Sequence, residues 1–361
     1  MANILEQLVN GESLSQAQAE QFFQQVISGE TAPELLASVL TALKIKGETP
    51  QEIAGAAVAI RGSATPFPKQ NFTLADCVGT GGDGADTINI STTAAILAAA
   101  CGLKMAKHGN RSVSSMSGSA DLLEALGVNL MKSPQTAALC LQQANICFLY
   151  APAYHPGFKH AAPVRKNMGV RTLFNILGPL VNPAHPDIMV LGVYTPDLLE
   201  TMAKSLVLTG IKQAWVVHGS GLDEIAIHGS SQIIEINDGQ LTQKTVSPAD
   251  FGLNTYALSD IKGGTPQENA DIVKAILSGQ GEPAHNTAVI INCAALLYLH
   301  REQLNGRCDD LASAASFASE VLASGKALTT LEKLVEVSNE PSANQEPSAD
   351  KKPSTQEVTN G

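Results

Sequence analysis

Apolar positions in the first part of the chain recur with the period of a helix. Leu36, Leu40 and Leu43 lie three or four residues apart, which places them on one helical face. Farther along, Thr49 opens a capping box that also carries a proline at the first helical position. These patterns predict a small all-helical domain over residues 1–66.

The pattern changes near residue 67 to short apolar runs that are separated by amphipathic stretches. Such alternation is typical of an α/β domain with a largely parallel sheet. We expect strands at 74–78, 104–106, 146–149, 188–193, 213–217, 224–227 and 233–236. We expect helices to begin near Ser91, Gly118, Pro134, Pro196, Pro266 and Asn286. The predicted fold class is therefore α/β, with a small helical N-terminal domain before a larger α/β domain, residues 67–337, whose central sheet is mostly parallel and surrounded by helices.

The last segment has a different composition. Residues 338–361 are rich in Ser, Pro, Asn, Gln, Glu and Lys and carry almost no large apolar side chain. Such a segment cannot bury enough surface to offset the entropy of ordering. We expect a disordered tail.

Charge and composition narrow the classes of function. The net charge of −11 disfavours nucleic-acid and membrane partners, because both need broad positive patches. The six cysteines show no C-x-x-C spacing and most lie in apolar runs, so we expect reduced, buried thiols without a disulfide framework or zinc site. Neither a signal peptide nor a membrane-spanning stretch is evident, and we expect a cytoplasmic protein.

A glycine-rich stretch follows the predicted strand 74–78. Four glycines fall between Gly79 and Gly84, and a helix is expected to begin near Ser91. Glycine lets backbone N–H groups approach an anion, and a helix N-terminus adds free donors and partial positive charge. We therefore expect a phosphate-binding loop.

Two better-known phosphate motifs do not fit this stretch. The letters match the dinucleotide pattern G-x-G-x-x-G, but that motif needs a helix opening within the glycines and an acidic residue about 20 positions later. Here the helix begins later, and Lys104 and Lys107 follow in place of an acid. A P-loop is excluded because no Gly-Lys-Ser/Thr follows the glycines. A plain glycine-rich surface turn is the remaining alternative.

A second polar loop has the sequence K-H-G-N-R-S-V-S-S, at residues 107–115. It brings two fixed cations, Lys107 and Arg111, together with several hydroxyl groups. Two anion-binding loops so close in the sequence indicate a ligand with more than one phosphate group.

Two further groups of charged residues have both a functional and a plain explanation. Asp223 and Glu224 follow the predicted strand 213–217, where adjacent carboxylates are usually a solvated loop. A diphosphate ligand, however, needs its charge neutralised, and Mg²⁺ with hard oxygen ligands is the common device. Arg165 lies in a basic segment that is equally compatible with a solvated surface, yet a guanidinium pairs with a carboxylate in a bidentate manner. Spacing alone decides neither assignment.

The chain resembles the anthranilate phosphoribosyltransferases in five stretches: G-T-G-G-D at 79–83, N-I-S-T at 89–92, K-H-G-N-R-S-V-S-S at 107–115, R-T-L-F-N-I-L-G-P-L-V-N-P at 171–183 and G-L-D-E at 221–224. The resemblance spans roughly residues 5–335, so chance agreement at one loop does not explain it. It implies transfer of the 5-phosphoribosyl group from phosphoribosyl diphosphate to anthranilate in tryptophan biosynthesis. It also implies a homodimer formed through the helical domain, and a hinge to which part of about 160–185 belongs.

The resemblance also assigns residues to this chemistry. Catalysis would fall to Lys107, Asn110 and Arg165, anthranilate binding to Gly79, Asn110 and Arg165, and Mg²⁺ binding to Ser91, Asp223 and Glu224. The residues that would bind phosphoribosyl diphosphate come from the two polar loops and from the helix starts beside them: Gly79, Thr80, Gly82, Asp83, Thr87, Asn89, Ile90, Ser91, Thr92, Lys107, His108, Gly109, Asn110, Arg111, Ser112, Val113, Ser114, Ser115 and Ser119. For His108, proton acceptance from the amine and a structural role both stay open.

Two other functions stay open at this point. A pyrimidine nucleoside phosphorylase has a similar fold and related chemistry, but it would need a different loop at 107–115 and a nucleobase pocket. A non-catalytic, nucleic-acid-binding relative would have lost the anthranilate site. Asn110, Arg165 and the negative net charge are unfavourable to that alternative.

Overall fold

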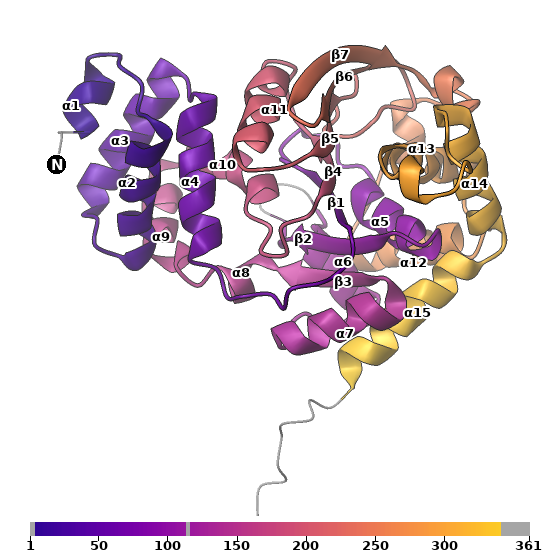
Figure 1. Ribbon diagram of the computed structural model, residues 1–361. Helices are drawn as coiled ribbons and strands as arrows, with labels where there is room; N and C mark the ends of the chain where they lie inside the picture. Colours follow the sequence, from indigo (N-terminus) through magenta and orange to yellow (C-terminus); the bar gives the residue numbers. More distant parts are fainter. Residues whose placement is uncertain (1–3, 113–115, 341–361) are drawn as a thin grey trace, which may run out of the picture.

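The computed structural model describes residues 4–112 and 116–340 (Figure 1). The chain begins with a bundle of four helices, α1 (Ile4–Val9), α2 (Gln16–Ser28), α3 (Pro33–Lys46) and α4 (Pro50–Gly62). Helices α9 (Phe158–Met168) and α10 (Phe174–Leu177), which come much later in the sequence, pack against this bundle. The helical body is therefore built from two separate parts of the chain.

A buried carboxylate fixes the start of helix α4. Thr49 caps this helix, and the Glu52 side chain returns to the Thr49 backbone N–H at 2.8 Å, as the capping box predicts. Glu52 also accepts from the backbone N–H of Leu14 at 2.9 Å and pairs with Lys46 at 2.9 Å. Its side chain is fully buried, so one carboxylate ties three segments of the bundle together.

The larger domain is organised around a sheet of seven strands in the order β3-β2-β1-β4-β5-β6-β7. The first five strands in this order, β3, β2, β1, β4 and β5, pair in parallel. Strands β6 and β7 add an antiparallel hairpin at one edge. The strand bounds are β1 (Leu74–Gly79), β2 (Lys104–Gly109), β3 (Ile146–Tyr150), β4 (Ile188–Gly192), β5 (Gln213–His218), β6 (Ser231–Asn237) and β7 (Gln240–Val246).

Helices cover both faces of the sheet. Figure 1 shows α11 (Leu198–Leu208) between the sheet and α4, while α5 (Ile90–Ala100), α13 (Pro283–Leu299) and α14 (Leu311–Ala323) lie on the other side. The remaining elements are α6 (Ser119–Ala125), α7 (Pro134–Ala144), α8 (Ala151–Tyr154), α12 (Pro266–Leu277), α15 (Lys326–Asn339) and the 3-10 turns η1 (Gly178–Leu180), η2 (Pro248–Phe251), η3 (Leu258–Ile261) and η4 (Arg301–Gln303).

Alternate residues of strand β4 belong to different cores. Ile188 and Val190 pack with α5 and α13 in the core of the large domain. Met189 and Leu191 point to the opposite face and pack into the core that contains the helical bundle. The bundle and the sheet therefore share one continuous apolar core.

The fold class predicted from the sequence is confirmed: a small helical N-terminal domain is followed by an α/β domain with a mostly parallel sheet. All six cysteines are buried as free thiols, as expected. Among the described residues, the helices are too short or too polar to cross a bilayer.

Three details of the prediction were wrong. The run 224–227 has no regular secondary structure, although Ile225, Ala226 and Ile227 are buried, so it is not a strand. Strand β7 was missed, because its mostly polar, exposed side chains carry no apolar pattern. Helix α15 continues through Asn339 with Ser338 buried, so the ordered chain extends past the expected boundary at 338.

We predict that Glu52→Ala lowers the free energy of unfolding by about 3 kcal/mol, because it leaves buried N–H groups and the Lys46 ammonium without their acceptor. Urea unfolding measures this loss. The control is Glu34→Ala in the exposed first turn of α3, which should stay within about 0.5 kcal/mol of the wild type. Equal stability of both variants would contradict a structural role for Glu52.

Candidate functional site

The turn that carries Asp223 and Glu224 crosses the carboxyl ends of three neighbouring strands. The crossing is possible because β1, β4 and β5 each end in or just before a glycine. A Cβ at Gly79 would overlap the Asp223 carboxylate, one at Gly192 the Asp223 backbone, and one at Gly219 the Glu224 carbonyl. Three strand ends thus leave room for the same acidic turn, at the edge of the sheet where α/β proteins bind ligands.

Both carboxylates of this turn accept hydrogen bonds from the expected phosphate-binding elements. Asp223 Oδ2 accepts from the backbone N–H of Gly81 at 2.6 Å, within the glycine-rich loop. Glu224 Oε1 accepts from the backbone N–H of Ser91 at 3.1 Å, in the first turn of α5. The structure therefore brings together Ser91, Asp223 and Glu224, the three residues expected at a metal ion.

Burial raises the pKa of both carboxylates above their ordinary values. The neighbouring charge of Asp83 raises the pKa of Asp223 further, and Asp223 in turn raises that of Glu224. Among residues 4–112 and 116–340, neither carboxylate forms an ion pair with a basic side chain. Crowded carboxylates without a cation are a donor set that suits a hard divalent ion such as Mg²⁺.

A metal ion would need additional ligands here. In the part of the chain that the structure describes, no three His, Cys, Asp or Glu side chains are grouped closely enough to hold one. Mg²⁺ commonly binds through one or two carboxylates and completes its shell with water and substrate phosphates. The Asp223–Glu224 pair with the Ser91 hydroxyl fits that mode.

Lys107 lies beneath the glycine-rich loop and is almost fully buried. Its ammonium donates to the carbonyl oxygen of Cys77 at 2.6 Å and lowers the pKa of Asp76, which burial raises to about 6. Asp76 is also held by the Asn182 amide at 2.8 Å. The cation expected at the diphosphate is thus embedded in a polar network behind the loop.

The His108 side chain is buried at the domain junction. Its Nδ1 faces the carbonyl oxygen of Gly178 at 3.2 Å, and its ring packs edge-on against His155 at 5.2 Å. Burial lowers the pKa of His108 to about 3 and that of His155 to about 4, and the neighbouring ring lowers that of His108 further. Both rings are therefore neutral at physiological pH, and this arrangement favours the structural role for His108.

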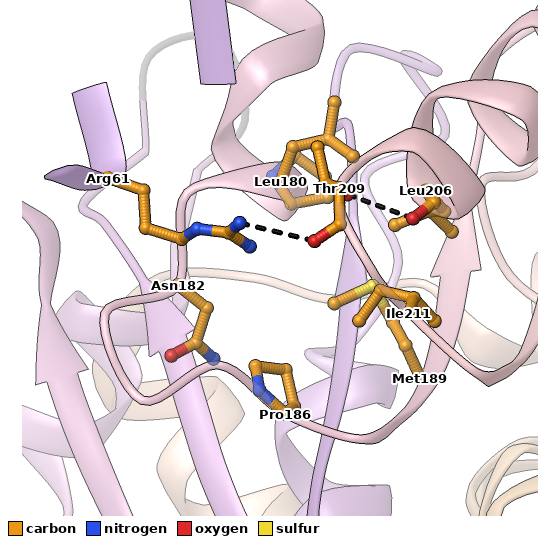
Figure 2. Close-up of a pocket in the computed structure, with 9 residues that line it drawn as sticks. Arg61, Leu180, Asn182, Pro186, Met189, Leu206, Thr209 and Ile211 are labelled. Carbon is orange, nitrogen blue, oxygen red and sulfur yellow. Dashed lines mark hydrogen bonds between the residues drawn. The ribbon is translucent and has the colours of Figure 1, made fainter. Parts of the chain in front are cut away.

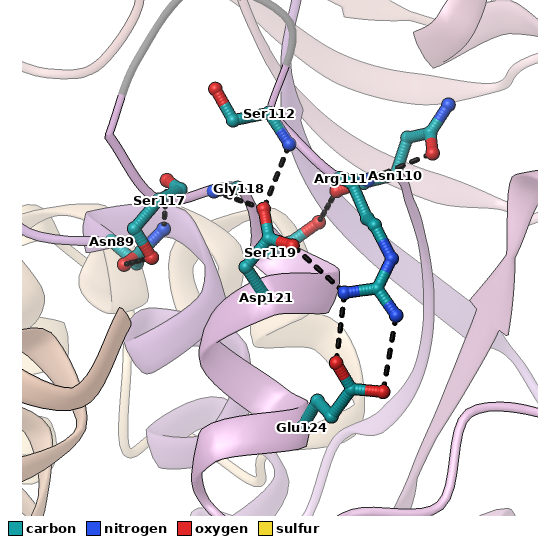
Figure 3. A network of polar contacts seen from close by, with 9 residues as sticks. All are labelled: Asn89, Asn110, Arg111, Ser112, Ser117, Gly118, Ser119, Asp121 and Glu124. Atoms are coloured by element: carbon teal, nitrogen blue, oxygen red, sulfur yellow. Dashed lines mark hydrogen bonds and ion pairs between the residues drawn. The ribbon is translucent and has the colours of Figure 1, made fainter. Parts of the chain in front are cut away.

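Ion pairs hold the described part of the second loop against helix α6 (Figure 3). Arg111 pairs with Asp121 at 2.9 Å and with Glu124 at 2.8 Å, and these bonds raise its pKa above the ordinary value. Asp121 also accepts from the backbone N–H of Ser112 at 2.9 Å. The second expected cation is thus already paired with two acids. Val113, Ser114 and Ser115 lie outside the described residues.

Other residues expected at the phosphates are either buried or bonded to neighbouring parts of the chain. Thr92 and Ile90 are buried in α5, Thr87 forms a β-bridge with Lys262, and a Cβ at Gly109 would overlap Ser119 Oγ. The Asn89 amide donates to the carbonyl of Ser117 at 3.0 Å (Figure 3), and the Ser119 hydroxyl donates to the Asn110 carbonyl at 3.2 Å. In the glycine-rich loop, Thr80 Oγ1 accepts from Tyr194 N at 3.2 Å and Asp83 Oδ1 from Ala85 N at 3.1 Å.

Arg165 lies on α9, in the helical body, and not beside the phosphate loops in the large domain. Its guanidinium stacks on the Phe174 ring at 5.2 Å, and partial burial lowers its pKa. Among the described residues, no carboxylate pairs with it. A half-buried, unpaired guanidinium is able to receive a carboxylate ligand.

Arg171 contacts the glycine-rich loop, which the sequence did not reveal. Its guanidinium stacks on Tyr194 at 4.5 Å and donates to the Gly82 carbonyl at 2.6 Å. The hinge segment is therefore bonded directly to the glycine-rich loop. Arg171 is the first residue of the family-like stretch 171–183, but its partner Gly82 lies 89 residues away, so no local pattern joins the two.

Figure 2 shows a small cavity at the domain junction. Pro186 and Met189 line it near the start of strand β4, whereas the acidic turn lies at the end of that strand. Its lining includes Arg61, Asn182 and Thr209, and the Arg61 guanidinium donates to the Thr209 carbonyl at 3.2 Å. The cavity has room for about one water molecule. A cavity of this size is too small for a substrate.

Comparison with protein families assigns both parts of the chain. Residues 2–64 match the helical bundle domain of the glycosyl transferase family, and residues 71–328 match its α/β domain.

Full-length relatives and solved structures are similar to the chain. It is 69% identical to an anthranilate phosphoribosyltransferase of Colwellia psychrerythraea, over 93% of this chain and 92% of that one. The crystal structure of anthranilate phosphoribosyltransferase from Thermus thermophilus is 40% identical, with a TM-score of 0.87 over 93% of this chain and 99% of that chain. The Saccharomyces cerevisiae enzyme in complex with PRPP and Mg is 29% identical, with a TM-score of 0.83 over 92% of this chain and 96% of that chain.

We predict that stability falls as the pH drops below about 6.5. His155 in the unfolded chain is protonated below this pH, whereas burial lowers the pKa of His155 in the folded chain to about 4. At about pH 5.5 this difference in the pKa of His155 should lower the free energy of unfolding by about 1 kcal/mol. The melting temperature of His155→Leu should therefore fall less steeply between about pH 7.5 and 5.5 than that of the wild type. The difference between the two proteins at about pH 8 gives the cost of the substitution itself. Parallel curves would refute the neutral, buried imidazole.

Proposed function

The chain belongs to the anthranilate phosphoribosyltransferases of the glycosyl transferase family, and from this membership we propose how its residues divide the reaction. The reaction moves the 5-phosphoribosyl group from phosphoribosyl diphosphate to the amine of anthranilate and releases diphosphate. The relatives that carry this name favour it over the phosphorylase and nucleic-acid-binding alternatives.

The observation that carries the proposal is the convergence of anion donors and carboxylates at one edge of the sheet. The Gly81 N–H donates to Asp223 and the Ser91 N–H donates to Glu224, so both donors lie at the acidic turn. Bond breaking at the ribose C1 builds negative charge on the leaving diphosphate, so the site must supply positive charge and donors at that point. The glycine-rich loop and the start of α5 supply the donors, and buried Lys107 supplies fixed charge behind them.

The residues of the acidic turn are proposed to hold Mg²⁺, together with the Ser91 hydroxyl. The Saccharomyces cerevisiae relative is described in complex with PRPP and Mg, which supports use of this ion. Bound there, Mg²⁺ would neutralise diphosphate oxygens and so favour departure of the leaving group. Asp223 and Glu224 are suited to this task because they lack a basic partner in the described chain.

Anthranilate is proposed to bind between the helical body and the phosphate loops. Arg165 would pair with its carboxylate from α9, while Gly79 and Asn110 would contact it from the large domain. An aromatic amine is unprotonated at neutral pH, so it needs positioning more than a strong base. The low pKa and the burial of His108 agree with a reaction that does not depend on this residue as a base.

A homodimer through the helical domain is also proposed. Val9 and Ile45, on α1 and α3, expose 70% and 82% of their surface, although both are large and apolar. Leu35, on α3, is 41% exposed. Exposed large apolar side chains on one small helical domain support an interaction surface there.

The direct test mixes the purified protein with anthranilate, phosphoribosyl diphosphate and Mg²⁺ and follows anthranilate fluorescence. We expect the signal to decay only when all components are present, with N-(5-phosphoribosyl)anthranilate as the product. Decay with nucleoside and phosphate, or no decay under any condition, would overturn the proposed reaction.

We predict that Arg165→Ala raises the anthranilate KM by about tenfold or more while kcat changes less, since a charge-assisted pair is lost. Steady-state kinetics measures both constants. Lys166→Ala, at the exposed neighbour on the same helix, is the matched control and should leave the KM unchanged. If the two variants have the same KM, Arg165 does not hold the substrate carboxylate.

A further inference from the structure

The two candidate metal ligands bond to the donors that the site would offer to an anion. Gly81 N–H donates to Asp223 at 2.6 Å, and Ser91 N–H donates to Glu224 at 3.1 Å. Ser91 stands in the first turn of an eleven-residue helix, where backbone N–H groups have no partner within the helix. These are donors that phosphate oxygens take at a helix N-terminus.

We propose that Asp223 and Glu224 make the site selective for metal-complexed diphosphate by occupying these N–H groups until the carboxylates bind a metal ion. Free diphosphate meets two carboxylates that already hold its donors and also repel its charge. Diphosphate that arrives with its metal ion offers the carboxylates another partner, so the donors become available. This inference rests on the proposed function, because it takes diphosphate as the group that the site must receive.

The structure allows this exchange without a change in the backbone of the turn. Leu222 exchanges two backbone hydrogen bonds with Gly219, at 3.0 and 3.1 Å, just before the acidic pair. After the pair, the backbone N–H of Ile225 donates to Asn292 Oδ1 at 3.0 Å. With both ends of the turn held, rotation of the two acidic side chains is sufficient to release the N–H groups.

The hydrogen bonds from Gly81 and Ser91 help to stabilise the charged carboxylates, and the charge of Lys107 also lowers the pKa of Glu224. Lys107, whose charge lowers the pKa of neighbouring Asp76, directs its ammonium to the Cys77 carbonyl and not to the turn. Neither carboxylate forms an ion pair in the described chain, so both are able to take a divalent cation as their partner. The same side chains therefore act as metal ligands in one state and as stand-ins for phosphate in the other.

The experiment measures binding of inorganic diphosphate to the full chain by calorimetry, once with a chelator and once with Mg²⁺. The wild type should bind the Mg²⁺ complex at least about tenfold more tightly than free diphosphate. The variant Asp223→Ala with Glu224→Ala should bind free diphosphate about tenfold more tightly than the wild type does, and Mg²⁺ should add little. Each single alanine variant gives the same comparison should the double variant not fold.

Two controls separate occupancy of the donors from simple charge repulsion. The variant Asp223→Asn with Glu224→Gln removes the charge but keeps an acceptor at each position. Its affinity for free diphosphate should therefore rise less than that of the double alanine variant. Asp86→Asn removes an exposed charge from the same loop, and asparagine tolerates the positive φ of 49° at this position. Its affinity for free diphosphate should equal that of the wild type.

The outcomes separate this inference from the proposed function. Equal gains for the amide and alanine pairs, no gain for either, or equal binding of free and Mg²⁺-complexed diphosphate by the wild type would each overturn the inference. The proposed function is tested separately, by wild-type consumption of anthranilate. A protein that consumes anthranilate but shows no gain in the variants therefore disproves the inference alone.

Discussion

Buried carboxyl groups at the carboxyl edge of the sheet are the constraint on which this site depends. Asp76, Asp223 and Glu224 are all placed where burial raises their pKa, so ionising each of these side chains within the fold costs free energy. Lys107, a glycine-rich loop and a helix start offset part of this cost. Buried ionisable groups that cost stability, at the edge of the sheet where α/β proteins bind ligands, are characteristic of a site selected for binding and catalysis.

The glycines at this edge serve two different purposes. Gly81 and Gly82 adopt positive φ angles of 68° and 81°, which turn the loop so that Gly81 N–H reaches the acidic turn. Gly79 and Gly192 lie at strand ends, and there the missing Cβ makes room for Asp223. The loop conformation and the position of the carboxylates are thus separate conditions that the sequence meets with the same residue type.

Local features were predictable from the sequence, and long-range ones were not. The capping box at Thr49, the glycine-rich loop and the start of α5 depend on neighbouring residues and were found. The contact between Gly81 and Asp223 spans 142 residues and became visible only in the fold. The run 224–227 was taken for a strand because it is apolar, yet its backbone bonds to the side chains of Asn292 and Ser231 instead of to another strand.

The shared apolar core restricts how this protein is able to change in evolution. Since Met189 and Leu191 belong to the same apolar core as the helical bundle and α11, each part of the chain is shaped to the other. A bundle taken from a distant relative would bring side chains of unsuitable volume to strand β4, and close-packed interiors tolerate such mismatches poorly. Chimeras of this enzyme should therefore exchange the bundle together with α9, α10, α11 and the residues of β4 that face them, as one inherited unit.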